Sequence, residues 1–350
     1  MFSQLQQLRA IPRVSSMPKT AEEISKATGF SITTIRFVLN GQSEKYRISA
    51  GTQKRINDYI AIHGYSVNHA ARSLRLKRTD TIGLIVPDLA NAYFARLMAE
   101  LEILCRKRSL LLLTASSHDD PELENRAVTN LLARGVDGLV IAPCQEAMLP
   151  QLKKNKARPA IVMFDRDYSP SPFPTVVSDN YQGAFEITRR LLQNADGPCY
   201  FLCAHSALPS IRDRMRGFVS ACEEKGIRDG ERLIWLDAEN MPEAGRRLMQ
   251  SLIADLGRAP SAFLCSSLMV LEGALQEIKA ETGRVDKKIL IGTFDDHAML
   301  DWLDNRVLSI KQDEEALAQR VFDRLIEPLG ERKKSNPLDS VPVELICRNL

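Results

Sequence analysis

Long hydrophobic segments, paired cysteines and a secretion signal are all missing from this sequence. The longest apolar runs, such as residues 110–113, are far too short to cross a bilayer, which takes about 20 residues. The first 17 residues include Arg9 and Arg13 but no apolar stretch of the kind that a secretory signal requires. Seven cysteines are scattered without a paired spacing, which favours reduced thiols over disulfides or a metal site. We therefore expect a cytoplasmic protein with no membrane partner.

Catalytic signatures are missing as well. The sequence contains no G-x-S-x-G elbow, no G-x-x-x-x-G-K-[ST] loop and no G-x-G-x-x-G after a predicted strand. No pattern pairs a nucleophile with a base. The adjacent Asp296 and His297 could suggest a metal site, but no third ligand follows at a fixed spacing. We expect neither an enzyme nor a bound cofactor or metal.

Charge is unevenly distributed along the 350 residues. The net charge is only +3, yet residues 1–78 hold 13 Lys/Arg and four Asp/Glu, which leaves the remainder of the chain acidic. Such asymmetry indicates a basic segment that meets a polyanion, although an ordinary solvated face would also fit the charge alone.

The basic segment shows the pattern of three short helices. Thr20 and Glu23 form a capping box at the start of the first helix, and Gly29 suits the turn that ends it. Ser31 can cap a second helix that runs to about Leu39, and Ser49 a third that ends at Gly64. Helix, glycine-containing turn and helix is the order of a helix-turn-helix.

From Thr81 onward, apolar strands alternate with helices. We expect strands at 82–86, 110–115, 138–142, 160–164, 199–203, 232–236, 262–265, 289–293, 308–310 and 343–347, and helices near 92–108, 122–134, 211–225, 243–256, 268–282 and 314–329. Continuous apolar strands between helices indicate parallel sheets covered on both faces. About 270 residues are many for one sheet, so we expect two α/β subdomains with a ligand cleft at the carboxyl ends of their strands.

Seven segments resemble the lactose/galactose repressor family of transcriptional regulators. They are TAEEISKATGFSITTIRFVLN at 20–40, HGYSVNHAARSLR at 63–75, TIGLIVPDLANAYF at 81–94, FDR at 164–166, RDRMRGF at 212–218, TFDDH at 293–297 and SIKQD at 309–313. The resemblance spans residues 19–348. The run GQSEKYRIS at 41–49, together with FDDH, looks closest to the fructose and sucrose repressors of this family.

The resemblance implies the fold class and the domain organisation. The expected fold is an N-terminal all-α helix-turn-helix head with a hinge helix, followed by an α/β body of two parallel-sheet subdomains like a periplasmic binding protein. We expect a flexible extension at 1–18, the DNA-binding head at 19–66, the hinge helix and linker at 67–80, and an effector-binding and dimerisation body at 81–350.

The resemblance also assigns DNA-binding residues in the head. Ile32 and Thr33, at the start of the second helix, would face base edges in the major groove. Contacts to phosphates are expected from Thr34, Arg36, Lys26, Tyr46 and Arg47, which would set the register without reading sequence. Phe37 departs from the pattern, because many family members carry an arginine there that reads a guanine, so no guanine contact is carried over. Each of these side chains could instead be only a solvated helix residue.

In the hinge, the family places a leucine that wedges between base steps of the minor groove. Leu74 matches that leucine, with Asn68, Ala71 and Arg75 around it. Val67 replaces the usual proline, which puts the rigidity of the hinge start in doubt. Leu74 could alternatively pack against the body.

The effector site is expected between the two subdomains. Arg214 matches the family's ligand-binding arginine and Asp295 its hydroxyl-binding aspartate, whereas Tyr93 and Phe94 could supply an aromatic wall. Asp165 and Gln312 are weaker candidates. Three alternatives stay open: Arg214 on the helix surface, Asp295 as a helix N-cap, and Phe94 as plain core.

Together these features predict a homodimeric repressor of a carbohydrate operon. It would bind pseudo-palindromic double-stranded operator DNA and respond to a sugar or sugar phosphate. A stand-alone sugar-binding receptor would have a similar body, but the basic head argues against it. A sugar enzyme with a DNA-binding-like head has no residues to support its chemistry.

Overall fold

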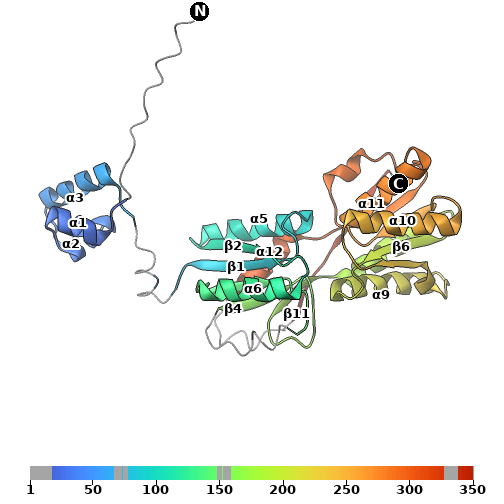
Figure 1. Ribbon diagram of the computed structural model, residues 1–350, viewed down its shortest axis with the longest axis horizontal. Coiled ribbons are helices and arrows are strands. Elements are labelled where there is room, and N and C mark those ends of the chain that lie inside the picture. Colours follow the sequence, from blue (N-terminus) through green and yellow to red (C-terminus); the bar gives the residue numbers. More distant parts are fainter. Residues whose placement is uncertain are drawn as a thin grey trace, which may run out of the picture. The chain divides into compact units, whose positions relative to one another are not determined.

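The computed structural model describes residues 18–66, 73, 78–147, 152, 159–326 and 338–349 (Figure 1). The chain divides into two compact units, residues 1–79 and 80–350. The expected hinge residues Asn68, Ala71 and Leu74, with Val67 and Arg75 beside them, lie outside the described residues.

Three helices make up the head within the first unit, namely α1 (Ala21–Thr28), α2 (Ile32–Leu39) and α3 (Ala50–His63). The predicted capping box of Thr20 and Glu23 is present, and Ser31 and Ser49 cap the next two helices with their side chains. Gly29 ends α1 in the left-handed conformation, with φ of 75°, which favours glycine. These local signals fix the helix boundaries, and the buried Ala21, Ile24, Ile35 and Ile56 hold the helices together.

The second unit contains two six-stranded sheets. The first has the order β11-β5-β4-β3-β1-β2 and is parallel throughout; its strands are β1 (Thr81–Val86), β2 (Leu111–Ser116), β3 (Gly138–Ile141), β4 (Ala160–Phe164), β5 (Thr175–Ser178) and β11 (Leu338–Val341). The second has the order β12-β10-β9-β8-β6-β7; its strands are β6 (Cys199–Ala204), β7 (Ile234–Asp237), β8 (Ala262–Cys265), β9 (Leu290–Phe294), β10 (Val307–Lys311) and β12 (Glu344–Arg348), of which only β12 runs antiparallel.

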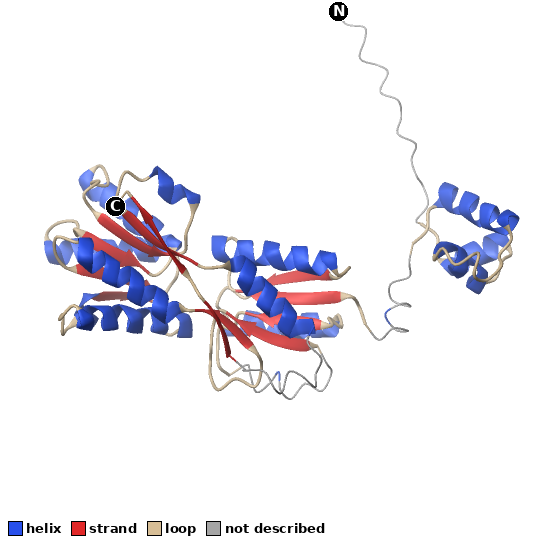
Figure 2. Cartoon of the chain, turned by 180° about the vertical axis from the view of Figure 1, so that it is seen from behind, coloured by secondary structure: helices blue, strands red, loops and turns tan. Residues whose placement is uncertain are grey.

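Helices cover both faces of each sheet (Figure 2). The helices of the first sheet are α5 (Ala92–Lys107), α6 (Pro121–Ala133) and α12 (Glu314–Ile326), and those of the second are α8 (Asn180–Asn194), α9 (Pro209–Glu224), α10 (Pro242–Leu256) and α11 (Leu268–Thr282). Two short 3-10 helices, η1 (Gly230–Leu233) and η2 (Ala298–Trp302), accompany the second sheet. Because each sheet is buried between helix layers, both form their own apolar core.

The chain passes between the two sheets three times. It leaves the first sheet after β5 to form α8, returns after β10 to form α12, and leaves again between β11 and β12. Because the crossings join the sheets at several points, residues after β4, β9 and β10 can meet although they are far apart in sequence.

Most predicted elements of the body are present, with three additions and one shift. The sequence analysis did not predict β5, α8 or β11. The two strands have only four residues each, and α8 buries Asn180 and Thr188, so neither shows a clean apolar pattern. The strand expected at 232–236 begins later, because residues 230–233 form η1. Among the described residues, no helix is both long and apolar enough to span a membrane.

Candidate functional site

Five polar side chains from the strand ends of both sheets meet in the second unit. We call them the polar cluster: Tyr93, near the start of α5; Asp165, directly after β4; Arg214, in α9; Asp295, directly after β9; and Gln312, directly after β10. Tyr93 interacts electrostatically with Asp165, Asp295 and Arg214, and Asp295 with Arg214, Gln312 and Asp165. The structure thus brings together five of the six predicted effector residues.

The two aspartates of the polar cluster occupy unusual backbone positions. Asp165 and Asp295 have φ angles of 65° and 67°, a region that residues other than glycine rarely adopt and that occurs preferentially at functional sites. Asp295 Oδ1 accepts a hydrogen bond of 2.6 Å from Gln312 Nε2. Burial raises the pKa of the Asp295 carboxyl, and Arg214 acts in the opposite direction. Asp295 is therefore fixed in place as an acceptor that is short of polar partners.

Arg214 is buried, with only 5% of its surface exposed, so the alternative of a helix-surface arginine is wrong. Its Nε donates to Asn180 Oδ1 at 2.8 Å, and its Nη1 donates to the carbonyl oxygen of Ser266 at 2.6 Å. The guanidinium carbon lies 4.0 Å from the centre of the Phe294 ring. These contacts orient the guanidinium group before any ligand binds.

Two atoms of the polar cluster are buried without a hydrogen-bond partner in the described part of the chain: Tyr93 Oη and Gln312 Oε1. Leaving such a group unpaired costs about 1–3 kcal/mol, which a ligand with matching groups would recover. Burial, and then the charges of Asp165 and Asp295, raise the pKa of Tyr93 well above its usual range, so the phenol stays a donor. The arrangement suits a ligand with several hydroxyl groups.

A second set of charged residues bridges the two sheets beside the polar cluster. Arg166 Nη1 binds Asp119 Oδ1 at 2.6 Å, and His205 Nε2 lies 3.7 Å from Asp119 Oδ2. Asp119 belongs to the first sheet's side and His205 follows β6 of the second. Arg166 Nε also lies 3.6 Å from Asp165 Oδ2, which connects this set to the polar cluster. The sequence analysis missed these residues, although the FDR motif contains Arg166.

Phe94 is the predicted effector residue that the structure places apart from the polar cluster. It packs in the apolar core against Phe164, edge to face, with ring centres 6.1 Å apart. Asp295 does not cap a helix, because His297 provides the N-cap of η2 through its side chain.

Asn180 is a site residue that sequence reasoning missed. It is buried at the first position of α8, where its amide donates to the carbonyl oxygen of Ser178 and its Oδ1 holds Arg214. The only signal was the Asp179-Asn180 pair after a short apolar run, which is too common to stand out.

The described residues contain no group of three or more His, Cys, Asp or Glu placed to hold a metal ion. Cys199 and Cys203 lie buried in β6 as free thiols, as expected from the sequence.

In the head, the predicted DNA-binding residues lie on and just after α2. Thr33 and Arg36 are exposed, whereas Ile32 is half-buried against the small core. The Thr34 hydroxyl is shared with the capping residue Ser31 at 2.8 Å, and Arg36 Nη2 lies 3.3 Å from Glu22 Oε1. The exposed surface of α2 therefore presents Thr33 and Arg36 most freely.

The segment after α2 places an aromatic ring against this helix. Phe37 and Tyr46 stack with ring centres 3.6 Å apart and an interplanar angle of 5°. Arg47 follows with a φ of 54°, and its side chain is exposed. The exposed Lys26 belongs to α1.

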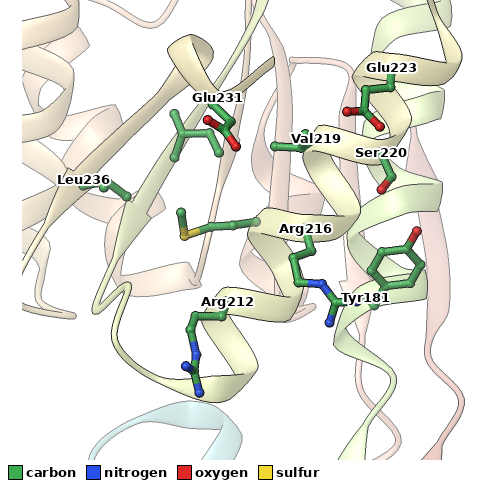
Figure 3. A pocket seen from close by; sticks show the side chains of 10 residues that line it. Tyr181, Arg212, Arg216, Val219, Ser220, Glu223, Glu231 and Leu236 are labelled. Atoms are coloured by element: carbon green, nitrogen blue, oxygen red, sulfur yellow. The ribbon is translucent and has the colours of Figure 1, made fainter. Parts of the chain in front are cut away.

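A hollow of about 630 Å³ lies outside the polar cluster, on the outer side of α9 (Figure 3). Arg212 and Arg216 reach it from α9, Tyr181 from α8 and Leu236 from β7. Helical spacing separates these two arginines from Arg214, which points inward.

Comparison with known proteins gives a consistent result. The family model of the periplasmic binding protein domain matches residues 82–327. The sucrose operon repressor of Klebsiella pneumoniae is 33% identical over 332 residues, which cover 94% of this chain and 98% of that protein. The fructose operon regulatory protein of Vibrio cholerae is 31% identical over 332 residues, which cover 95% of this chain and 98% of that protein.

Solved structures agree on the fold. The Pseudomonas putida Cra transcriptional dual regulator, in complex with fructose 1-phosphate, matches with a TM-score of 0.69 and 28% identity, over 78% of this chain and 100% of that chain. The lac repressor dimer bound to operator matches with a TM-score of 0.79 over 94% of this chain and 98% of that chain; at 21% identity this likeness shows the fold alone. It includes the helical head, so the predicted helix-turn-helix head and two-subdomain body are confirmed.

Proposed function

We propose the function of this chain from its family: it belongs to the lactose/galactose repressor family of transcriptional regulators. It is a sequence-specific DNA-binding regulator that represses a carbohydrate-utilisation operon. A sugar or sugar phosphate between the two subdomains of its body alters its affinity for the operator. The listed names of relatives support this assignment, since they regulate sucrose and fructose operons and one was solved with fructose 1-phosphate.

One observation carries the proposal: the same chain joins a basic head to a body in which both sheets contribute to one buried polar cluster. Tyr93 Oη and Gln312 Oε1 are left unpaired among the described residues, and Arg214 is oriented by neighbours that need no ligand. A ligand that pairs with these groups would bind residues of both sheets at once, and would favour one angle between them over another.

The DNA-binding surface is proposed on α2 and the segment after it. Ile32 and Thr33 would face base edges, whereas Arg36, Arg47 and Lys26 would contact phosphates and set the register. The hinge residues Asn68, Ala71 and Leu74 remain an expectation from the family resemblance, with Leu74 as the wedge in the minor groove.

Two copies are proposed to bind one operator. A homodimer presents two heads related by a two-fold axis, so its site would be a pseudo-palindrome with matching half-sites. A ligand changes operator affinity only by its different affinity for the two subdomain angles, and for a sugar inducer the expected effect is release. No catalytic step is required, so the ligand would leave chemically unchanged.

The test is a fluorescence-anisotropy titration of the full chain with a duplex from the region upstream of its own gene. Tight binding that weakens steeply with salt is expected, together with release by fructose, sucrose or fructose 1-phosphate. Sugar binding without sequence-preferring DNA binding would favour the stand-alone receptor and overturn the proposal. A scrambled duplex of equal length and composition is the control.

A further inference from the structure

We propose that Tyr46 is a positioning residue for DNA recognition, whose ring holds Phe37 in the orientation that contacts the 5-methyl group of a thymine. The inference rests on the proposed DNA-binding function of the head. It assigns Tyr46 a role through Phe37, rather than the phosphate contact that the sequence suggested.

Phe37 lies on the recognition side of α2. It follows Thr33 by four residues, so the two side chains share one face of the helix. Thr33 is exposed and Phe37 is half-buried, which leaves part of the ring accessible beside the predicted readout position. The Phe37 ring is therefore placed to enter the groove that Thr33 enters.

The segment that follows α2 is built to hold Tyr46 over Phe37. The amide of Gln42 donates to the Phe37 carbonyl at 2.8 Å, and the amide of Tyr46 donates to the Gln42 carbonyl at 3.2 Å. The amide of Ile48 closes the turn onto the carbonyl of Ser43 at 2.8 Å, and Ser43 is buried. Because backbone hydrogen bonds lead from Phe37 to Tyr46, the loop has a defined shape before DNA binds.

The ring contact itself is unusually close and parallel. Ring centres 3.6 Å apart with planes 5° apart leave little offset, whereas free aromatic pairs prefer offset or edge-to-face arrangements. The backbone of the loop must therefore contribute to the arrangement. Lys45 Nζ lies 5.7 Å from the centre of the Tyr46 ring, which adds a cation beside the pair.

The chemistry of Phe37 selects its target. A phenylalanine ring has no hydrogen-bond donor or acceptor, so it cannot read the polar edge of a guanine or adenine. The thymine 5-methyl is the apolar group that the major groove offers for such a contact. With one ring face covered by Tyr46, Phe37 can approach this methyl group only with its remaining surface, so the position of Tyr46 decides which base pair it meets.

The experiment uses the full chain and its operator duplex, in which each thymine is replaced in turn by deoxyuridine. Removal of one contacted methyl should weaken wild-type binding by about fourfold at one symmetric position in the half-sites, since a methyl-sized contact contributes about 0.8 kcal/mol. Tyr46→Phe keeps the ring and should reproduce this profile. Tyr46→Ala and Phe37→Ala should each weaken binding to the thymine operator and lose the further effect of deoxyuridine at that position.

Three results would overturn the inference. They are a wild-type profile without any methyl effect, a Tyr46→Ala profile that keeps the effect, and a loss in Tyr46→Phe equal to that in Tyr46→Ala, which would assign the role to the hydroxyl group. Thermal unfolding followed by circular dichroism checks that each head is folded, and Tyr46→Leu replaces Tyr46→Ala if that variant unfolds. Failure of wild type to prefer any operator would instead refute the proposed function, before the variants are compared.

Discussion

The head and the body place their functional side chains in opposite environments. In the head, the exposed Thr33, Arg36 and Arg47 surround a core of four buried residues. In the body, Tyr93 and Arg214 each have only 5% of their surface exposed and lie between large apolar cores. The comparison teaches that the head can be read largely from its surface, whereas the body's site depends on which buried groups lack partners.

The difference has an energetic consequence. A small head can lose its fold through a single core change, because below about 70–80 residues one core rarely supplies more than a few kcal/mol. The body has ample core, so changes to its polar cluster should alter ligand binding without unfolding it. The following variants test this contrast, in order of decreasing effect.

Ile56→Ala should have the largest effect. Ile56 is fully buried in α3 at the centre of the head, and its truncation should cost about 2–5 kcal/mol. We expect the thermal transition of the head to disappear and operator affinity to fall by more than 100-fold, while the transition of the body is unchanged. Ile62→Ala is the matched control, since Ile62 lies on the same helix with 73% of its surface exposed. Equal losses in both variants would contradict the role given to the core.

Arg214→Ala should abolish the response to effector but not DNA binding. The change leaves Asn180 and Asp295 without the guanidinium group that they face, and removing one partner of a buried charge set costs about 3–5 kcal/mol. Effector affinity, measured by calorimetry, should fall by at least 100-fold. Arg216→Ala is the control, because Arg216 is exposed two residues further along α9 and pairs with Asp213. An unchanged effector affinity in Arg214→Ala would remove this arginine from the site.

Asp295→Asn should stabilise the ligand-free body at neutral pH while weakening effector binding. The folded-state pKa of Asp295 is raised above 3.8 by burial, so the folded state binds the proton more tightly than the unfolded state. The penalty is absent below this value and grows as pH rises through the raised pKa. Urea unfolding should show the variant more stable at pH 7, by on the order of 1 kcal/mol, with the difference shrinking toward pH 4.

The neighbouring Asp296 provides the control for this prediction. Its Oδ1 lies 2.8 Å from Arg348 Nη2, so Asp296→Asn removes an ion pair and should destabilise the body. A stability difference for Asp295→Asn that is the same at both pH values would refute the assignment of a buried, raised carboxyl.

Arg36→Ala should have the smallest effect on stability. The pair with Glu22 is exposed at both ends, and such pairs contribute about 0–1 kcal/mol. If Arg36 contacts a phosphate, the slope of log affinity against log salt should fall by about one, uniformly across operator sequences. Glu22→Ala frees the arginine and should leave that slope unchanged. A change in base preference for Arg36→Ala would indicate readout rather than a backbone contact.

Sequence patterns predicted the local structure of the head well because its signals are local. Thr20, Ser31 and Ser49 cap helices where their side chains accept from amides three residues ahead, and Gly29 takes the left-handed turn. Such contacts span a few residues, so they can be read without knowing the rest of the fold. The same reasoning could not see that Phe37 and Tyr46 stack, since their contact depends on the path of the intervening loop.

In the body, the strands were predictable and several connections were not. Continuous apolar runs indicated most of the buried strands, but α8 buries Asn180 and Thr188 among its apolar residues and escaped notice. Asp119 and His205 follow β2 and β6 and meet only because the two sheets face each other. Their spacing in sequence contains no trace of that contact.

The sequence by itself determined the helix caps, the apolar strands, the basic head and the motifs that hold Arg214 and Asp295, because these depend on neighbouring residues or on residue type. Only the tertiary structure decided that Arg214 is buried against Asn180, that Tyr93 and Gln312 keep unpaired atoms beside Asp295, and that Phe94 packs in the core. The physical reason is that burial and pairing depend on segments which the three crossings bring together from opposite ends of the body.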